Sequence, residues 1–499
     1  MELDHHPVII GVSQVTNRGD TIREPLDLVV EAARTALDDA RVPTSEPLAS
    51  VDAVSVVSWA YEDLATSVGE ALGTPVGTAT NTPNGGDQPT RRVVELGRRA
   101  MADGGIHLVV GGEAMRSVAR GMRSGEVASW TPPPPDGGFP DPRDFTSPEA
   151  YRARLQYPPT VYPLYEHGLR ARLGQTRREA QAWSALLWAD MAAVASTRPG
   201  AWFTDPVTAE RLLSVDDGNR MINDPYPKLM NALLGVDQAA AAVVTDVATA
   251  RRLGVPDDRV VHLWAGAGAA DSFDVLGRVA YDRSPAMELV LDAAFAQAGI
   301  GGARDDLSLI ELYSCFPCVP KLALTHLGWD PATSISVTGG LTAFGGPGNA
   351  YMLCAITAMV DELRASDDDR PALLYGQGEF VTKHHALVVG RGPRPSGALP
   401  EDDEPARQAE VDAEARPAYE AAPTGAVAIE SLTVTFDREG APTEAIVVGR
   451  LDDGRRCAAV DDNADDLAAL TDPDGEPVGR RGTVAAGAGE DPNRFRIDD

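Results

Sequence analysis

The chain has 499 residues, of which 43% are hydrophobic, and its formal net charge is −30. This length exceeds what one ordinary hydrophobic core supports, so two or three domains are expected. The negative charge argues against nucleic acid as a partner, and no run approaches the roughly 18 to 20 apolar residues of a membrane span. Four cysteines give no disulfide framework, and the chain opens with charge rather than the apolar core of a signal peptide. We therefore expect a cytoplasmic protein that does not associate with membranes.

The first part of the chain alternates short apolar runs with helical patterns. Glu24-Pro25 opens one such pattern, with proline at the first helical position, and Gly85-Gly86-Asp87 precedes another. The apolar runs lie at 7–12, 51–59 and 108–110. This alternation predicts a parallel or mixed sheet with helices on both faces.

The alternation of apolar runs and helical patterns stops in the middle of the chain and resumes further along. Residues 117–235 include an aromatic and proline-rich piece at 157–165 and a helical pattern around 176–193, and we interpret them as an inserted lid over a pocket. From residue 285 the first half recurs, because Pro25 and Gly86, and Pro285 and Gly346, are both 61 residues apart. Equal spacing of a helix start and a glycine turn predicts two similar α/β halves.

The end of the chain has a different composition. Residues 401–420 are acidic and alanine-rich, which is typical of a solvated linker, and alternating runs at 429–436 and 445–451 with intervening turns predict β-hairpins. The expected domains are a first half at 1–116 and 236–270, an insertion at 117–235, a second half at 271–398, a linker at 399–424 and a β domain at 425–499.

Three groups of residues carry a family resemblance. They are Leu312-Tyr313-Ser314-Cys315-Phe316, Gly339-Gly340-Leu341 with Gly345-Gly346-Pro347-Gly348-Asn349, and Gly85-Gly86-Asp87-Gln88-Pro89 with Gly111-Gly112. Together they resemble the thiolase superfamily, in particular its sterol-carrier-type thiolases and thiolase-like proteins. The resemblance covers residues 7 to about 392 and implies a duplicated thiolase fold, with two similar βαβαβαββ halves layered α-β-α-β-α. Residues 448–456 resemble the small antiparallel OB-type barrel that is appended to one class of thiolase-like proteins.

The chain departs from the family at four functional positions. A thiolase acylates a cysteine at the start of the helix after the third strand and activates it with the histidine of a Gly-His-Pro turn. The matching positions here are Gly86 or its neighbour, and Gly346. The second family cysteine falls at Gly376, and the Asn or His that holds the oxyanion falls at Tyr313. Glycine cannot be acylated, so ordinary thiolysis is not expected.

Five residues remain candidates for catalysis: Cys315, His384, Tyr313, Asn349 and Tyr351. The resemblance implies that Cys315 points into the catalytic cavity and that the other residues lie on loops around it. Tyr313 has the chemistry of an acid or hydrogen-bond donor, and His384 that of a base. The structural alternative is that Cys315 is a small buried hydrophobe and Tyr313 a packed aromatic.

The resemblance also implies coenzyme A or an acyl-CoA as the ligand, with no permanently bound cofactor. Lys228 in the insertion is a candidate for its phosphates, although a surface salt bridge is the alternative. Gly86, Gly346 and Gly378 are the expected ligand-contacting turn positions. Cys315-Phe316-Pro317-Cys318 has the spacing of a redox pair, but no thioredoxin-like pattern surrounds it, and the other cysteines give no second pair for zinc. No metal site is expected.

Three functions follow from this resemblance. The leading hypothesis is an acyl-CoA acyltransferase-like protein of lipid or sterol side-chain breakdown whose conventional activity is weak or lost. The second is a retro-aldol lyase that acts on a β-hydroxyacyl-CoA through tyrosines, and the third is a non-catalytic CoA-binding or scaffold protein. Thiolases pair through edge strands of the first half, so a homodimer is expected, or a monomer if the appended domain covers that edge.

Overall fold

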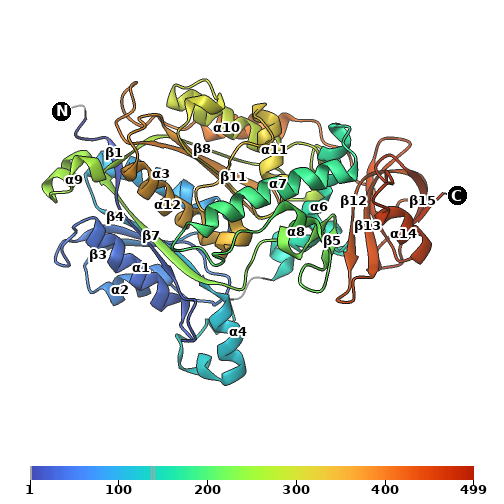
Figure 1. Ribbon diagram of the computed structural model, residues 1–499, viewed down its shortest axis with the longest axis horizontal. Coiled ribbons are helices and arrows are strands. Elements are labelled where there is room, and N and C mark those ends of the chain that lie inside the picture. The colour runs from blue at the N-terminus through green and yellow to red at the C-terminus, as the bar shows by residue number, and fades with distance from the viewer. Residues whose placement is uncertain (1–2, 136, 139–140, 499) are drawn as a thin grey trace.

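The computed structural model describes residues 3–135, 137–138 and 141–498. The chain forms a layered α/β core and a C-terminal β-barrel, which lies at one end of the molecule beside the inserted region (Figure 1). Within the described residues, no helix combines the length and the apolar character that crossing a membrane requires.

The core is built on one nine-stranded mixed sheet with the order β3-β2-β4-β7-β1-β8-β11-β10-β9. Its two halves repeat each other: β1-β7-β4-β2 matches β8-β11-β10-β9, with two antiparallel pairings followed by a parallel one in each. The strands are β1 Pro7–Thr16, β2 Leu48–Ala53, β3 Val76–Asn81, β4 His107–Ala114, β7 Asp237–Asp246, β8 Val261–Ala270, β9 Ile310–Leu312, β10 Ala372–Gly378 and β11 Lys383–Gly390. This is the duplication that the 61-residue spacing predicted.

Helices form three layers around the two half-sheets. The helices α1 (Pro25–Asp39) and α2 (Leu64–Leu72) pack on the first half, and α10 (Pro285–Ala298) packs on the second with α11 (Cys318–Leu327) beside it. The helices α3 (Gln88–Asp103) and α12 (Tyr351–Ala365) contact strands of both halves and so form the central layer. Every residue of β7 is buried because helices cover both of its faces. The α-β-α-β-α layering is therefore confirmed.

One expected boundary differs from the structure. The range 236–270 was expected to belong as a whole to the first half. However, β8 pairs with β11 over most of its length and with β1 at two positions only. It occupies the place in the second half that β1 occupies in the first, which an apolar run cannot reveal, because the run specifies a strand and not its neighbour.

The inserted region is mainly helical. Its elements are α4 Met115–Ser124, α5 Pro148–Arg152, α6 Pro158–Arg172, α7 Arg177–Ser196, α8 Ala209–Leu213, β5 Met221–Asp224 and β6 Tyr226–Pro227. Thr176 begins α7 with a capping box to Glu179, which explains why the pattern at 176–193 predicted this helix correctly.

The C-terminal domain is a closed five-stranded barrel. Its strand order is β12-β13-β14-β16-β15, and β12 pairs with both β13 and β15 to close it. All these pairings are antiparallel except β14 with β16. The elements are β12 Gly425–Phe436, β13 Pro442–Leu451, β14 Arg456–Asp461, α14 Ala464–Thr471, β15 Arg481–Ala485 and β16 Arg494–Ile497. The strand β5 of the insertion extends this sheet by pairing with β12.

The acidic segment before the barrel is not a solvated linker. Residues Glu404–Ala413 form α13, which packs on β8 and buries Arg407 and Val411. The Arg407 Nε atom donates to the Gly268 carbonyl at 2.9 Å. The acidic composition concealed a buried helical face with four-residue spacing.

The barrel also leaves the edge strand of the first half uncovered. It packs on the insertion, whereas β3 ends the sheet with four of its six residues exposed. The appended domain therefore does not shield this edge within one chain, and the homodimer and monomer alternatives both stay predictions.

Candidate functional site

Four loops meet beneath the insertion, and we call them the four-loop site: residues 85–88, 313–316, 345–349 and 376–379. The first loop leads into α3, the second follows β9, the third precedes α12, and the fourth comprises the end of β10 and the residue after it. The Gly85 amide donates to the Asn349 side chain at 3.0 Å. Gly376 and Gly378 lie so close to residues 85–87 that a β-carbon at either would come within 3.0 Å of them. Helix starts and strand ends converge here, as is usual for sites in α/β folds.

The position of the missing nucleophile is filled by a tyrosine. A β-carbon at Gly86 would lie 2.5 Å from the Gln377 carbonyl oxygen and 2.8 Å from both the Cε2 and hydroxyl atoms of Tyr313. The Tyr313 hydroxyl makes no hydrogen bond within the described residues, and burial raises the pKa of this phenol well above its ordinary value. Tyr313 therefore stays protonated and retains a free donor beside Gly86.

Cys315 lies in the same loop but is not activated. Burial raises the pKa of its thiol to about 12, and the Gln377 Nε2 atom approaches its sulfur at 3.4 Å. The Cys315 side chain is therefore a thiol at neutral pH, with the character of a buried hydrophobe.

Tyr162 of α6 closes the site from the side of the insertion. Its hydroxyl donates to the Glu379 carbonyl at 2.5 Å and accepts from Gln377 Nε2 at 2.7 Å, and its ring stacks on Phe316 at 4.5 Å. Sequence reasoning missed both Tyr162 and Gln377. The aromatic and proline-rich composition of 157–165 was the available signal for Tyr162.

Tyr351 and Asn349 have structural partners. The fully buried Tyr351 hydroxyl donates to Glu311 Oε1 at 2.6 Å, and its ring packs edge-on against Tyr313 with centroids 5.6 Å apart. Burial raises the pKa of Glu311, whose carboxyl also accepts from the Val337 amide at 2.8 Å. Asn349 Nδ2 donates to the carbonyl of Ser55 at 2.9 Å. Tyr351 thus packs against the ring of Tyr313, and Asn349 holds the 85–88 loop through the Gly85 amide.

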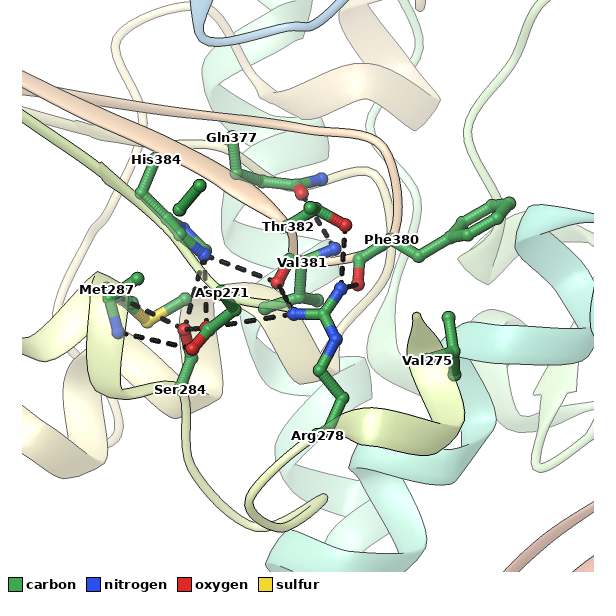
Figure 2. Close-up of polar contacts among 12 residues, drawn as sticks. Asp271, Val275, Arg278, Ser284, Met287, Gln377, Phe380, Val381, Thr382 and His384 are labelled. Carbon is green, nitrogen blue, oxygen red and sulfur yellow. Dashed lines mark hydrogen bonds and ion pairs between the residues drawn. The ribbon is translucent and has the colours of Figure 1, made fainter. Parts of the chain in front are cut away.

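The structure does not bring His384 into the four-loop site. The imidazole is fully buried, with Nδ1 2.7 Å from the Tyr375 hydroxyl. Its Nε2 atom lies 3.2 Å from Ser284 Oγ and 3.5 Å from Asp271 Oδ2 (Figure 2). Side chains alternate along β11, so His384 faces the start of α10 whereas Lys383 faces the 85–88 loop. The sequence pattern located the strand but gave no choice between its faces.

Two charged residues that sequence reasoning missed, Lys383 and Asp87, lie beside the Gly85-Gly86 turn. The Lys383 ammonium donates to the Asn84 carbonyl at 2.9 Å and pairs with Glu379 at 2.5 Å. Asp87 is almost fully buried, burial raises its pKa, and its Oδ1 atom has no hydrogen-bond partner in the described part of the chain. Lysine is rare in this sequence, which was the one signal for Lys383.

The backbone is strained at the end of the fourth loop and in the turn that follows it. Glu379 and Val381 have φ values of +58° and +56°, in the left-handed region that non-glycine residues rarely adopt and that is least favourable for a β-branched side chain. Strain of this kind clusters at functional sites and persists only where surrounding contacts hold it.

The expected ligand-binding positions are divided between two places. Gly86, Gly346 and Gly378 lie in the four-loop site, where the Gly346 amide donates to the Leu233 carbonyl of the insertion at 2.9 Å. Lys228 is exposed on a short 3₁₀ turn of the insertion, and the residues described include no ion-pair partner for it. It is available to a ligand but is not part of the four-loop site.

The cysteines of the described residues are free and buried. No cluster of His, Cys, Asp and Glu suited to a metal ion occurs among the residues that the structure describes. Cys315 and Cys318 are both free and buried, and burial raises the pKa of the Cys318 thiol well above its ordinary value.

Comparison with known proteins places these features in a family. The model of the thiolase-like protein type 1 additional C-terminal domain matches residues 407–488, from within α13 into the barrel. A monomeric SCP2-thiolase like protein type 1 from Mycobacterium smegmatis is similar over 99% of this chain and 100% of its own, with 29% identity and a TM-score of 0.84.

Two further structures share the fold of the core. The Ltp2-ChsH2(DUF35) aldolase has a TM-score of 0.59 and 17% identity, covering 78% of this chain and 98% of its own. An acetyl-CoA acetyltransferase from Syntrophomonas wolfei has a TM-score of 0.56 and 16% identity, covering 77% and 99%. Comparison with curated protein sequences gave no match. The chain therefore has the fold of the thiolase superfamily, and residues 407–488 match the additional C-terminal domain of the type 1 thiolase-like proteins.

Proposed function

We propose that this protein binds acyl-CoA thioesters at the four-loop site without forming an acyl-cysteine. The observation that carries the proposal is the packing of Tyr313 against Gly86, which leaves a hydrogen-bond donor where a side-chain nucleophile would stand. The neighbouring thiol of Cys315 is protonated at neutral pH and cannot replace that nucleophile. Such a ligand belongs to lipid or sterol side-chain metabolism.

In this proposal Tyr313 recognises the thioester. Its hydroxyl is protonated and free, so it donates a hydrogen bond to the thioester oxygen. Tyr313 and Cys315 retain 7% and 8% exposure, so the site is nearly closed and a ligand enters by moving Tyr162 or the residues around it. Lys383, which is 29% exposed, and Lys228 are the cations available to the phosphates of CoA.

A retro-aldol lyase is the second candidate. That chemistry needs no covalent intermediate, so Gly86 is no obstacle to it. The free Tyr313 hydroxyl favours this candidate because an acid catalyst must have its proton available to the substrate. Tyr351 contacts the Tyr313 ring, but its own hydroxyl is held by Glu311.

Calorimetric titration with CoA and with acetyl-, propionyl- and octanoyl-CoA tests the proposal. We expect saturable binding, and an affinity for acyl-CoA that falls at least about tenfold in Tyr313→Phe, because the donor to the thioester is lost. Tyr157→Phe is the matched control, since Tyr157 belongs to the insertion and is 50% exposed. Absence of binding by the wild type refutes the proposal and leaves the scaffold function. Cleavage of a β-hydroxyacyl-CoA that is lost in Tyr313→Phe establishes the lyase.

A further inference from the structure

The C-terminal barrel contacts the core through a fully buried arginine. Arg456 of β14 has no exposed surface, and its Nη1 atom donates to the carbonyls of Leu276, at 2.9 Å, and Arg278. Its other nitrogens bind Glu430 of the barrel at 2.9 and 2.6 Å, and the guanidinium lies over the Tyr281 ring at 4.8 Å. A charged side chain buried in this way is stable only with all its partners in place, so the barrel and the 276–281 segment are held together.

The segment that Arg456 holds carries a second buried arginine. Arg278 extends into the turn between β10 and β11 and donates to the Phe380 carbonyl at 3.1 Å, to the Thr382 hydroxyl at 2.6 Å and to the Val381 carbonyl (Figure 2). Asp271 balances its charge at 3.7 Å and also accepts a hydrogen bond from Ser284. One guanidinium thus fixes three successive residues of this turn.

That turn forms one wall of the four-loop site. It contains the left-handed residues Glu379 and Val381, and the Glu379 carbonyl accepts from Tyr162, which covers the site. The Val381 amide donates to Gln377 Oε1 at 3.1 Å, and the same side chain contacts Cys315 through its amide nitrogen. A turn with two left-handed non-glycine residues needs external contacts to keep its conformation, and Arg278 supplies them.

We propose that the C-terminal barrel is a positioning element of the four-loop site, acting through Arg456 and Arg278. Arg456 fixes the 276–278 backbone, Arg278 fixes the 380–382 turn, and the turn orients Gln377 and Tyr162 over Cys315. The geometry of this linkage stands without any ligand, and its consequence for affinity rests on the function proposed above.

The barrel offers a matched control for this linkage. Arg450 of β13 binds the same carboxylate, Glu430, at 2.7 and 2.9 Å, but it is one-third exposed and its other contact is the Gly454 carbonyl within the barrel. Removing Arg450 therefore disturbs the same ion pair without loosening the 276–278 segment. Only Arg456 joins Glu430 to the core among the described residues that bind this carboxylate.

Amide hydrogen exchange on the full-length chain tests the proposal. In Arg456→Met, the protected amides of Val381 and Thr382 should exchange at least about tenfold faster, whereas those of the barrel strand β13 keep their wild-type rates. Arg450→Met should leave Val381 and Thr382 unchanged. Acyl-CoA affinity should fall with Arg456→Met and not with Arg450→Met.

A second variant keeps the test decisive if Arg456→Met also loosens the barrel. Arg278→Lys preserves the charge opposite Asp271 but cannot make the forked contacts, so it should raise exchange at 380–382 without affecting β13. Wild-type exchange at 380–382 in either variant, with the barrel intact, overturns the proposal. Faster exchange with no acyl-CoA binding by the wild type would uphold the positioning role and refute only the proposed ligand.

Discussion

Gly86→Ala tests whether the nucleophile position is truly closed. The added methyl group would lie 2.5 Å from the Gln377 carbonyl oxygen and 2.8 Å from Tyr313, well inside normal contact distance. Tyr313 can shift, but the Gln377 carbonyl belongs to β10 and cannot move without disturbing the sheet. Overpacking of this kind costs about 1–3 kcal/mol of unfolding free energy.

The matched control is Gly235→Ala. Nothing lies within 4 Å of a β-carbon at Gly235, and neither Gly235 nor Gly86 has a left-handed φ. Both substitutions restrict the unfolded chain equally, which stabilises the folded state by about 0.4–1 kcal/mol. The difference between the two variants therefore isolates the contact energy at Gly86.

Urea unfolding followed by circular dichroism measures this difference. We expect Gly86→Ala to be less stable than Gly235→Ala by about 1–3 kcal/mol. Equal stability of the two variants would mean that Gly86 has free space above it. A catalytic side chain could then be accommodated there, and the closed-site account would be refuted.

Three further predictions follow from buried groups. Burial raises the pKa of Glu113 from 4.5 to about 7, so the unfolded chain loses this proton at lower pH than the folded chain does. The contribution of Glu113 to the free energy of unfolding therefore falls as the pH rises from 4.5 to about 7. Glu113→Gln should flatten that part of the pH profile of stability measured by urea unfolding, and an unchanged slope would contradict the raised pKa. Lys321→Met leaves Glu166, its buried partner at 2.5 Å, uncompensated and should cost about 3–5 kcal/mol in the same assay, with partial recovery in the double variant Lys321→Met/Glu166→Gln. Because the pKa of Cys315 is raised to about 12, iodoacetamide at pH 8 should label it only after denaturation, and rapid labelling of the native protein would show a reactive thiolate.

Local signals in the sequence were sufficient for much of the fold. Pro25 and Pro285 begin α1 and α10, and the glycine turns at Gly86 and Gly346 precede α3 and α12, so the repeat spacing identified equivalent elements in the two halves. Proline at a helix start and glycine at a tight turn act within a few residues of chain, which is why such signals can be read without a structure.

The arrangement of the site depended on contacts that no local pattern specifies. The direction of His384 is set by which face of β11 meets α10, and the covering role of Tyr162 arises from packing of the insertion on residues more than 150 positions away. The docking of α13 was hidden for the same reason, because Val411 is one apolar residue in an acidic segment and only β8 gives it a partner.

Intact-mass spectrometry with acetyl-CoA distinguishes a bound acyl-CoA from an acyl-enzyme. We expect a complex of protein and ligand under native conditions and an unmodified protein mass after denaturation, because Gly86 and the protonated Cys315 accept no acyl group. The complex should weaken in Tyr313→Phe. An acetyl adduct that survives denaturation would show an acyl-enzyme, and the absence of any native complex would show that the four-loop site does not bind acetyl-CoA; either result refutes the proposed function.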